Sequence, residues 1–198
     1  MTHEFGPHAR RRIDAVAIGA SAGGIDALFT LLTGLSGHRL PPVVIVLHLP
    51  PGHDSRLPEI FAARLRLRVG EARPGETLAP GWVYFAPPDY HLLVEPEQTF
   101  SLSCEPPVNY SRPAIDLLFE SCAEAFGPAL LAIVLTGAND DGAEGLARVR
   151  ERGGLAVVQA PQEAQYSAMP QAALARAGAD LVLPLASIRE FLATLAGS

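Results

Sequence analysis

The chain has 198 residues, of which 48% are hydrophobic and 18% charged, and its 21 acidic and 15 basic residues give a formal charge of −6. This composition is typical of one folded globular domain, and it excludes a mostly disordered chain and disfavours nucleic-acid binding. Because no apolar run approaches the ~20 residues of a membrane span and residues 1–12 lack the apolar region of a signal peptide, we expect a cytoplasmic protein without membrane insertion.

The first part of the chain predicts a strand, a tight turn and a helix. Residues 1–12 are expected to be a disordered tail, and residues 13–198 to form the domain. An apolar run over 13–18 leads into the glycine-rich turn 19–24, and helical spacing of leucines follows, so Ser21 is placed at a helix N-terminus. Such a turn either binds a phosphate or presents a nucleophilic serine, while a mere packing turn is the simplest alternative.

The middle of the chain continues this α/β pattern and then departs from it. Residues 43–47 form a β-branched run typical of a strand buried on both faces, and it ends at His48. A helix is expected over about 56–65. From 81 to 103 the residues predict a hairpin of 81–86 with 91–95, with a third short strand over 99–103.

Regular alternation of helices and strands then resumes to the end of the chain. Pro113 suits the first turn of a helix, and further strands and helices follow. These elements are a helix after Pro113, a strand over 130–136, a helix over 143–152, a strand over 155–159, a helix over 169–177, a strand over 180–183 and a helix over 187–195. The predicted fold is therefore α/β: a doubly wound, mostly parallel sheet in a Rossmann-like three-layer arrangement, with an added antiparallel hairpin near its C-terminal rim.

Polar residues of three kinds follow three of the predicted strands. Ser21, His48 and Asp141 each come after a strand, and catalytic groups of parallel sheets collect at that rim. Taken singly, Ser21 and Asp141 would be ordinary helix caps and His48 a structural histidine. Together they supply a nucleophile, a base and an orienting carboxylate.

The remaining histidines and cysteines carry no such pattern. His53 and His91 are assigned to turns and the surface. Cys104 and Cys122 are expected to be free thiols, because the sequence shows no export signal. Neither has the Cys-x-x-Cys spacing that redox or zinc chemistry uses.

At these residues the sequence resembles the catalytic domain of the chemotaxis protein-glutamate methylesterases, the CheB family. The resemblance runs from Ile13 to about Leu195 and rests on motifs in the same order. They are Ala17-Ile-Gly-Ala-Ser21-Ala-Gly-Gly, His48-Leu-Pro, Val83-Tyr-Phe-Ala-Pro with His91 downstream, Arg112-Pro-Ala-Ile-Asp116-Leu-Leu-Phe, Leu135-Thr-Gly-Ala-Asn-Asp-Asp141-Gly-Ala-Glu-Gly-Leu146, and Met169-Pro through Val182-Leu-Pro184.

The resemblance implies a serine hydrolase that removes γ-methyl esters from glutamyl side chains of chemoreceptors and releases methanol; related members also deamidate receptor glutamines. The catalytic triad carries over onto Ser21, His48 and Asp141. Backbone N–H groups near Ala22 and Gly23, and in the loop with Ala138 and Asn139, are then the candidates for holding the oxyanion. No metal or cofactor is implied.

Several residues around the implied site depart from the family's usual pattern. Ala22 replaces a threonine, and Ala138-Asn139 replaces Met-Gly. Leu47 and Leu49 flank His48 in place of glutamine and methionine, and Gln159-Ala-Pro-Gln162 varies a usual Gln-Asp-Pro. Only residues 1–12 precede the first strand, so we expect a stand-alone form without the family's receiver domain.

The implied partners are methylated cytoplasmic helices of chemoreceptors and a separate response-regulator or chemosensory signalling protein. Arg112 and Tyr166 are candidates for holding an acidic receptor surface. Two other readings stay open at this point. One is a Rossmann-like module that holds a nucleotide phosphate on the turn 19–24; the other keeps the fold as a scaffold or as an esterase for another substrate.

Overall fold

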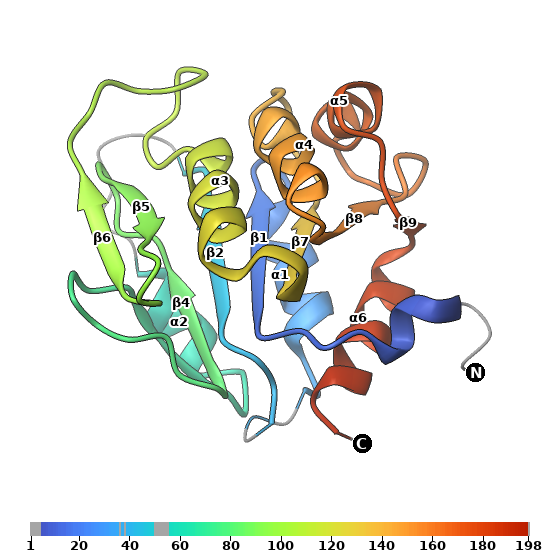
Figure 1. The fold of residues 1–198 in the computed structure, drawn as a ribbon, viewed down its shortest axis with the longest axis horizontal. Coiled ribbons are helices and arrows are strands. Elements are labelled where there is room, and N and C mark those ends of the chain that lie inside the picture. Colours follow the sequence, from blue (N-terminus) through green and yellow to red (C-terminus); the bar gives the residue numbers. More distant parts are fainter. Residues whose placement is uncertain (1–4, 36, 38, 50–55, 198) are drawn as a thin grey trace.

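The computed structural model describes residues 5–35, 37, 39–49 and 56–197, and within them seven parallel strands form one sheet in the order β3-β4-β2-β1-β7-β8-β9 (Figure 1). The α/β prediction, a doubly wound parallel sheet with an added antiparallel hairpin, is confirmed. The strands of the sheet are β1 (Ala15–Ala20), β2 (Val43–Leu47), β3 (Arg68–Glu71), β4 (Trp82–Phe85), β7 (Leu130–Val134), β8 (Leu155–Gln159) and β9 (Leu181–Leu183).

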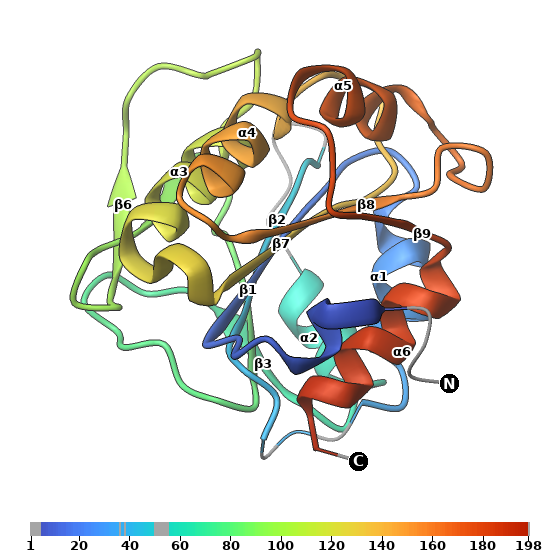
Figure 2. The same ribbon diagram turned by 45° about the vertical axis from the view of Figure 1, so that its right-hand side comes forward.

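The helices cover both faces of the sheet, so that two separate apolar cores form on either side of it (Figure 2). One core holds the apolar residues of α1, α2 and α6, and the other holds those of α3, α4 and α5. The helices are α1 (Gly24–Leu32), α2 (Leu57–Ala62), α3 (Ile115–Phe126), α4 (Ala143–Glu151), α5 (Ala168–Arg176) and α6 (Leu185–Leu195), and Gly127–Ala129 forms a 3-10 turn after α3. None of the helices in the described part of the chain combines the length and the apolar character needed to cross a membrane.

The sequence of β1 decides which helix lies close to the sheet. Val16 and Ile18 point into the core of α1, α2 and α6, whereas Ala15 and Ala17 point to the other face. A Cβ at Gly19 would overlap with the side chain of Ile115. Small residues on one face of β1 therefore let α3 approach the central strand closely.

The strand order places a switch point at β1. The chain moves from β1 to β2 on one side of β1, and later returns with β7 on its other side. In such sheets the loops beyond the carboxyl ends of the two central strands part and leave a crevice. The loops after β1, β2 and β7 therefore border one crevice.

The predicted hairpin pairs the wrong strands. Residues 82–85 do not pair with residues 91–94; they form β4, which lies parallel between β2 and β3. The antiparallel pair is instead β5 (His91–Val94) with β6 (Phe100–Ser103). It packs against α3, where the Ser121 hydroxyl accepts the Val94 N–H at 3.1 Å. The short turn 87–90 resembles a hairpin loop. The apolar side chains of β4 are, however, stabilised more by burial between two strands of the sheet than they would be in an exposed hairpin.

The start of the chain is tied to the last helix. We expected residues 1–12 to form a disordered tail; residues 1–4 lie outside the described residues, and Gly6–Arg10 forms a short 3-10 helix. Phe5 is buried, with its ring centroid 5.1 Å from that of Phe191 in α6. The domain therefore gains an apolar contact before β1.

We predict that Gly145→Ala destabilises the protein. A Cβ at this position in α4 would lie 2.7 Å from the carbonyl oxygen of Asp116 and 2.8 Å from the Phe119 Cβ in α3. Overpacking of this kind outweighs the gain of about 1 kcal/mol in helix propensity, so we expect a net loss of roughly 2 kcal/mol in the free energy of unfolding. Urea unfolding measures this loss.

The matched control is Gly70→Ala in β3, where the added Cβ would lie at an ordinary 3.4 Å from the Trp82 ring. Its effect should be much smaller. Equal unfolding midpoints for Gly145→Ala and the parent would show that α3 and α4 do not need this close approach.

Candidate active site

Ser21, His48 and Asp141 follow three adjacent strands of the sheet. Ser21 comes directly after β1 and His48 directly after β2, and Asp141 lies in the loop that leaves β7. The His48 N–H donates to Ala20 O at 3.0 Å, and the Ser21 N–H donates to Thr136 O at 3.0 Å. The β ladder thus extends past the strand ends and fixes the backbone of both residues.

Ser21 lies in the turn between β1 and α1, but it does not cap α1. The N-cap of α1 is Gly23, which has φ +77°, and the helix has no side-chain cap hydrogen bond. Ser21 and His48 line one cleft of about 350 Å³ with residues of the glycine-rich turn, Leu47, Leu49 and Gln165. The capping role that a serine often has at this position is therefore not what places Ser21 here.

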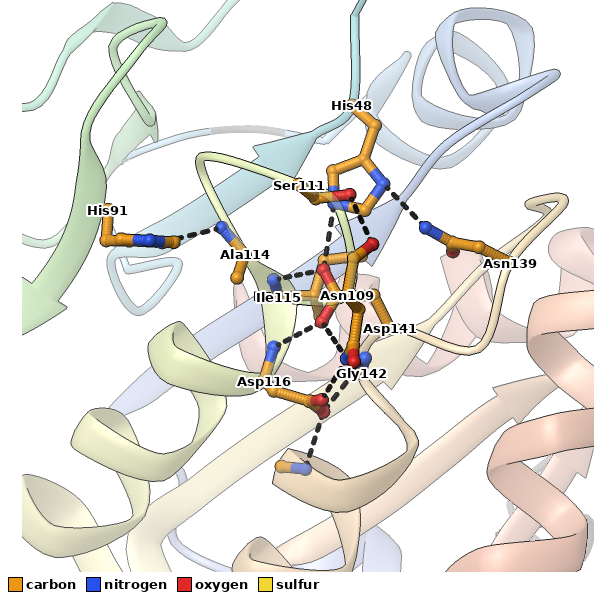
Figure 3. Close-up of polar contacts among 11 residues, drawn as sticks. His48, His91, Asn109, Ser111, Ala114, Ile115, Asp116, Asn139, Asp141 and Gly142 are labelled. Carbon is orange, nitrogen blue, oxygen red and sulfur yellow. Dashed lines mark hydrogen bonds and ion pairs between the residues drawn. The ribbon is translucent and has the colours of Figure 1, made fainter. Parts of the chain in front are cut away.

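His48 and Asp141 contact each other in the interior. The His48 Nε2 lies 2.9 Å from Asp141 Oδ2, and the two side chains are 12% and 0% exposed. The distance is that of an ion pair, although the direction departs from that of a well-formed hydrogen bond. Figure 3 shows the His48 ring standing over the Asp141 carboxylate.

Asp141 caps a helix, but not the one that follows it. Its Oδ2 accepts the Ile115 N–H at 2.7 Å and its Oδ1 accepts the Asp116 N–H at 3.1 Å, both at the start of α3. Burial by itself raises the pKa of the Asp141 carboxyl, but the contact with His48 and these two N–H donors outweigh burial and hold the pKa below its ordinary value. Asp141 is therefore kept ionised beside the imidazole.

Asp116, in α3, in turn accepts backbone N–H groups at the start of α4. Its Oδ1 accepts the N–H groups of Gly142 at 2.9 Å and Gly145 at 2.7 Å. Asn109 Nδ2 donates to Asp116 Oδ2 at 2.8 Å and makes a longer contact, 3.4 Å, with Asp141 Oδ1. Each carboxylate thus satisfies N–H groups that a helix N-terminus leaves without a partner.

The two carboxylates differ in how easily they ionise. Asp116 is 5% exposed. Its burial raises the pKa, the N–H bonds from Gly145 and Gly142 lower it, and the charge on Asp141 raises it again, so that it reaches about 6. Near neutral pH the molecule therefore keeps a second negative charge close to Asp141, at a cost in stability.

Asn139 lies on the other side of the His48 ring. Its Nδ2 is 3.5 Å from His48 Nδ1, and its Oδ1 is buried without a hydrogen-bond partner. Because the Asp141 carboxylate favours a proton on Nε2, Nδ1 of the neutral ring is an acceptor. The ring nitrogen available to take a proton from a nucleophile is therefore Nδ1.

The loop after β7 packs directly against Ser21. A Cβ at Gly137 would overlap with the Met169 side chain and lie 3.0 Å from the Ser21 Cβ. The Gly137 N–H donates to Tyr166 O at 3.0 Å. This bond engages one N–H group of the loop in which we expected an oxyanion donor. The predicted candidates remain Ala22, Gly23, Ala138 and Asn139.

Arg112 and Tyr166 are both tied to loops at the rim. Arg112 Nη1 donates to the carbonyl oxygens of Cys104 and Glu105 at 3.2 and 3.1 Å. The Tyr166 N–H donates to Thr136 Oγ1 at 2.9 Å, while the residue as a whole is 45% exposed. Arg112 therefore holds a loop of its own chain, and Tyr166 presents its ring to solvent.

The surface assignment of His91 is wrong, and that of His53 lies outside the described residues. His91 is fully buried; its Nδ1 accepts the Ala114 N–H at 3.2 Å and its Nε2 lies 3.1 Å from Pro106 O. It thus anchors the segment that leads into α3. The free state expected for Cys104 and Cys122 is confirmed.

Sequence reasoning missed Asn109 and Asp116 as parts of the site. Asp116 was visible as an acidic residue at the start of an apolar helix, which reads as an ordinary first-turn carboxylate. Asn109 lies in a loop with φ +49°, a backbone conformation that asparagine tolerates, and no periodic pattern marks it. Only the packing of α3 against α4 brings them to Asp141.

Comparison with known proteins gives one consistent result. Residues 16–192 match the family model described as CheB methylesterase. The chain is 43% identical over 182 residues to a Leptospira interrogans protein named "Putative protein-glutamate methylesterase/protein-glutamine glutaminase", covering 92% of this chain and 94% of that one. It is 40% identical over 176 residues to protein-glutamate methylesterase/protein-glutamine glutaminase 2 of Pseudomonas aeruginosa.

The solved structures agree with this result. The fold is similar to the crystal structure of the Thermotoga maritima CheB methylesterase catalytic domain, with a TM-score of 0.87 and 33% identity, over 92% of this chain and 98% of that one. The match covers 87% of this chain but 50% of the Pseudomonas aeruginosa protein, so the chain spans about half the length of that relative.

We predict that the buried charge on Asp116 costs stability between pH 4 and pH 6. Its pKa is about 6 in the folded protein, against an ordinary value of 3.8. The folded state therefore binds this proton more tightly, and stability falls as pH rises through this window. Asp116→Asn lacks this titration, so its unfolding free energy relative to the parent should increase by about 2 kcal/mol from pH 4 to pH 7.

Urea unfolding of both proteins at a series of pH values measures this difference. The slope with pH is the informative quantity, because the substitution also changes hydrogen bonds at every pH. A difference that stays constant from pH 4 to pH 7 would show that Asp116 ionises as an exposed carboxyl does.

Proposed function

The chain belongs to the CheB methylesterase family, and we propose that it hydrolyses γ-methyl esters of glutamyl side chains on chemoreceptors, with release of methanol, and that it also deamidates glutamines at such sites. The observation that carries the proposal is the 2.9 Å contact of His48 Nε2 with the buried Asp141 Oδ2, beside a cleft that Ser21 lines. This arrangement supports the roles of orienting carboxylate for Asp141, base for His48 and nucleophile for Ser21.

In the proposed reaction, His48 Nδ1 takes the proton of Ser21 as Ser21 Oγ attacks the ester carbonyl carbon. The tetrahedral intermediate collapses, the bond to the methoxy oxygen breaks, and Nδ1 returns the proton to the departing methanol. A water then loses a proton to Nδ1 and attacks the acyl-enzyme. The bond from the acyl carbon to Ser21 Oγ breaks, Nδ1 returns the proton to Oγ, and the glutamate side chain is released. For a glutamine substrate the leaving group is ammonia.

Asp141 contributes through the ring of His48. It stabilises the charge that the imidazole gains in each proton transfer, and it holds the Nε2 proton on the side away from Ser21. The N–H bonds from Ile115 and Asp116 keep its oxygens in place. Because the ionised form of Asp141 is favoured, it is ready to support the imidazolium at neutral pH.

The cleft suits an uncharged group. Leu47 and Leu49 line it, and Asp26 lines it at the start of α1. A carboxylate in this place repels a phosphate, and no acidic residue ends β2 to bind a ribose, so these residues weigh against the nucleotide-binding reading. A methyl ester or a carboxamide carries no charge and meets no such repulsion.

The proposed partners follow from the reaction. We propose that the chain acts in the cytoplasm on the cytoplasmic helices of methylated chemoreceptors, with a response-regulator or chemosensory signalling protein as a second partner. The exposed ring of Tyr166 beside the cleft is a candidate contact for the receptor helix.

We predict that Ser21→Ala abolishes methanol release from a methylated chemoreceptor cytoplasmic fragment. Removal of the nucleophile stops acyl transfer, so kcat should fall at least about 1,000-fold while the fold is kept. His48→Ala should give a loss of similar size, because the two residues act as a unit. A methanol assay at equal protein concentration, with circular dichroism as the check of folding, measures both.

The control is Gln98→Ala, a substitution in the turn between β5 and β6, which should leave the rate unchanged. Full activity of Ser21→Ala would contradict the serine mechanism. Absence of methanol release by the parent from several receptor fragments would contradict the methylesterase function itself.

A further inference from the structure

Asp116 is a buried carboxylate that the proposed mechanism does not use, although it lies beside Asp141. Its Oδ1 accepts the N–H groups of Gly142 and Gly145 at 2.9 and 2.7 Å, and its Oδ2 accepts Asn109 Nδ2 at 2.8 Å. Donors thus approach both oxygens. A carboxylate is the side chain of this size that accepts hydrogen bonds on both of its ends.

An asparagine in this place would keep the shape and lose one acceptor. Its single oxygen would serve Gly142 and Gly145, and its NH₂ group would then face the NH₂ group of Asn109. Two donors that face each other at this half-buried contact are unfavourable. The three donors around Asp116 therefore favour a carboxylate over a carboxamide at this position.

The same contacts reach Asp141 by two routes. Asn109 Nδ2 lies 3.4 Å from Asp141 Oδ1 and so bridges the two carboxylates. Gly142 directly follows Asp141, so the bond from its N–H to Asp116 fixes the peptide that carries Asp141. Figure 3 shows Asn109 and the Gly142 nitrogen between the two carboxylates, with His48 above them.

We propose that Asp116 is a positioning residue for the triad: through Asn109 and the Asp141–Gly142 peptide, it holds the Asp141 carboxylate in the orientation that faces His48. The inference rests on the proposed function and deepens it. In this role Asp116 does not contact the substrate. Its substitution should therefore change kcat rather than KM.

Asp116→Asn tests the Asn109 route directly. With NH₂ opposite NH₂, Asn109 either moves away or turns its amide, and a turned amide places Oδ1 against Asp141 Oδ1. In both cases Asp141 loses its bond from Asn109 and is free to tilt away from His48. A small misplacement of a catalytic group is costly, so we expect kcat for methanol release to fall about 10- to 100-fold, with KM changed less than about twofold.

Asn109→Gly is the second variant, and it does not depend on folding of the Asp116 variant. Asn109 has φ +49°, which glycine adopts without strain, and its residue is exposed, so the substitution removes the side chain alone. We expect a kcat loss similar to that of Asp116→Asn. Because both act through one bridge, the double variant should lose no more than roughly threefold beyond the more affected single variant.

Glu120→Gln is the matched control. Glu120 is also on α3, and together with Asp116, Asp140, Glu144 and Arg176 it lines a separate cleft of about 700 Å³. Burial and the charges of Glu144 and Asp141 raise its pKa while Arg148 lowers it, so it is in the same electrostatic environment. It makes no bond to Asn109 among the contacts of the described residues. Removal of its charge should change kcat less than about twofold.

The outcomes separate this inference from the proposed function. A parent that releases methanol, with kcat losses in Asp116→Asn and Asn109→Gly that are not additive, supports the inference. An active parent whose kcat is unchanged in Asn109→Gly overturns it, and so do losses that multiply in the double variant, or a loss in Glu120→Gln equal to that in Asp116→Asn. A parent that is inactive on every receptor fragment overturns both proposals.

Discussion

The site depends on a reciprocal contact between two helix N-termini, in which a carboxylate beside each helix start accepts backbone N–H groups of the other helix. Asp141, just before α4, accepts N–H groups at the start of α3, and Asp116, in α3, accepts N–H groups at the start of α4. Each interaction satisfies donors that a buried helix end leaves without partners. The reciprocal contact brings two negative charges together in the interior, which is unfavourable in itself. The molecule tolerates this because the helix ends, Asn109 and His48 surround the pair with donors.

Close packing makes the reciprocal contact geometrically attainable. Gly19 in β1 admits Ile115, and Gly145 in α4 lies against the backbone of Asp116. With larger residues at these positions, α3 would stand away from both the sheet and α4, and neither carboxylate would reach the opposite helix. Gly19 and Gly145 therefore help to set the geometry of the site, although neither of them lines it. Stability and site geometry depend on the same contacts.

The arrangement of His48 defines the chemistry that the cleft supports. Asp141 contacts Nε2, which leaves Nδ1 of the neutral ring as the acceptor. Asn139 Nδ2 lies 3.5 Å from the same Nδ1, and Ser21 lines the cleft that His48 borders. The apolar side chains of Leu47 and Leu49 favour binding of a neutral acyl group in the cleft, and the negative charge of Asp26 disfavours binding of a phosphate. Fold and cleft therefore point to acyl transfer rather than to nucleotide binding.

The sequence by itself determined the α/β class, most strand and helix positions, and the three strand ends that carry Ser21, His48 and Asp141, because apolar periodicity and glycine-rich turns are local signals. It failed where pairing is non-local. Residues 82–85 joined the parallel sheet instead of a hairpin, and His91 became a buried anchor of the segment before α3. The role of Asp116 and Asn109 was decided by tertiary structure alone. Their partners in Asp141 and Gly142 lie 26 to 32 residues away along the chain. Only the packing of α3 on α4 brings a second carboxylate and its bridging amide to Asp141.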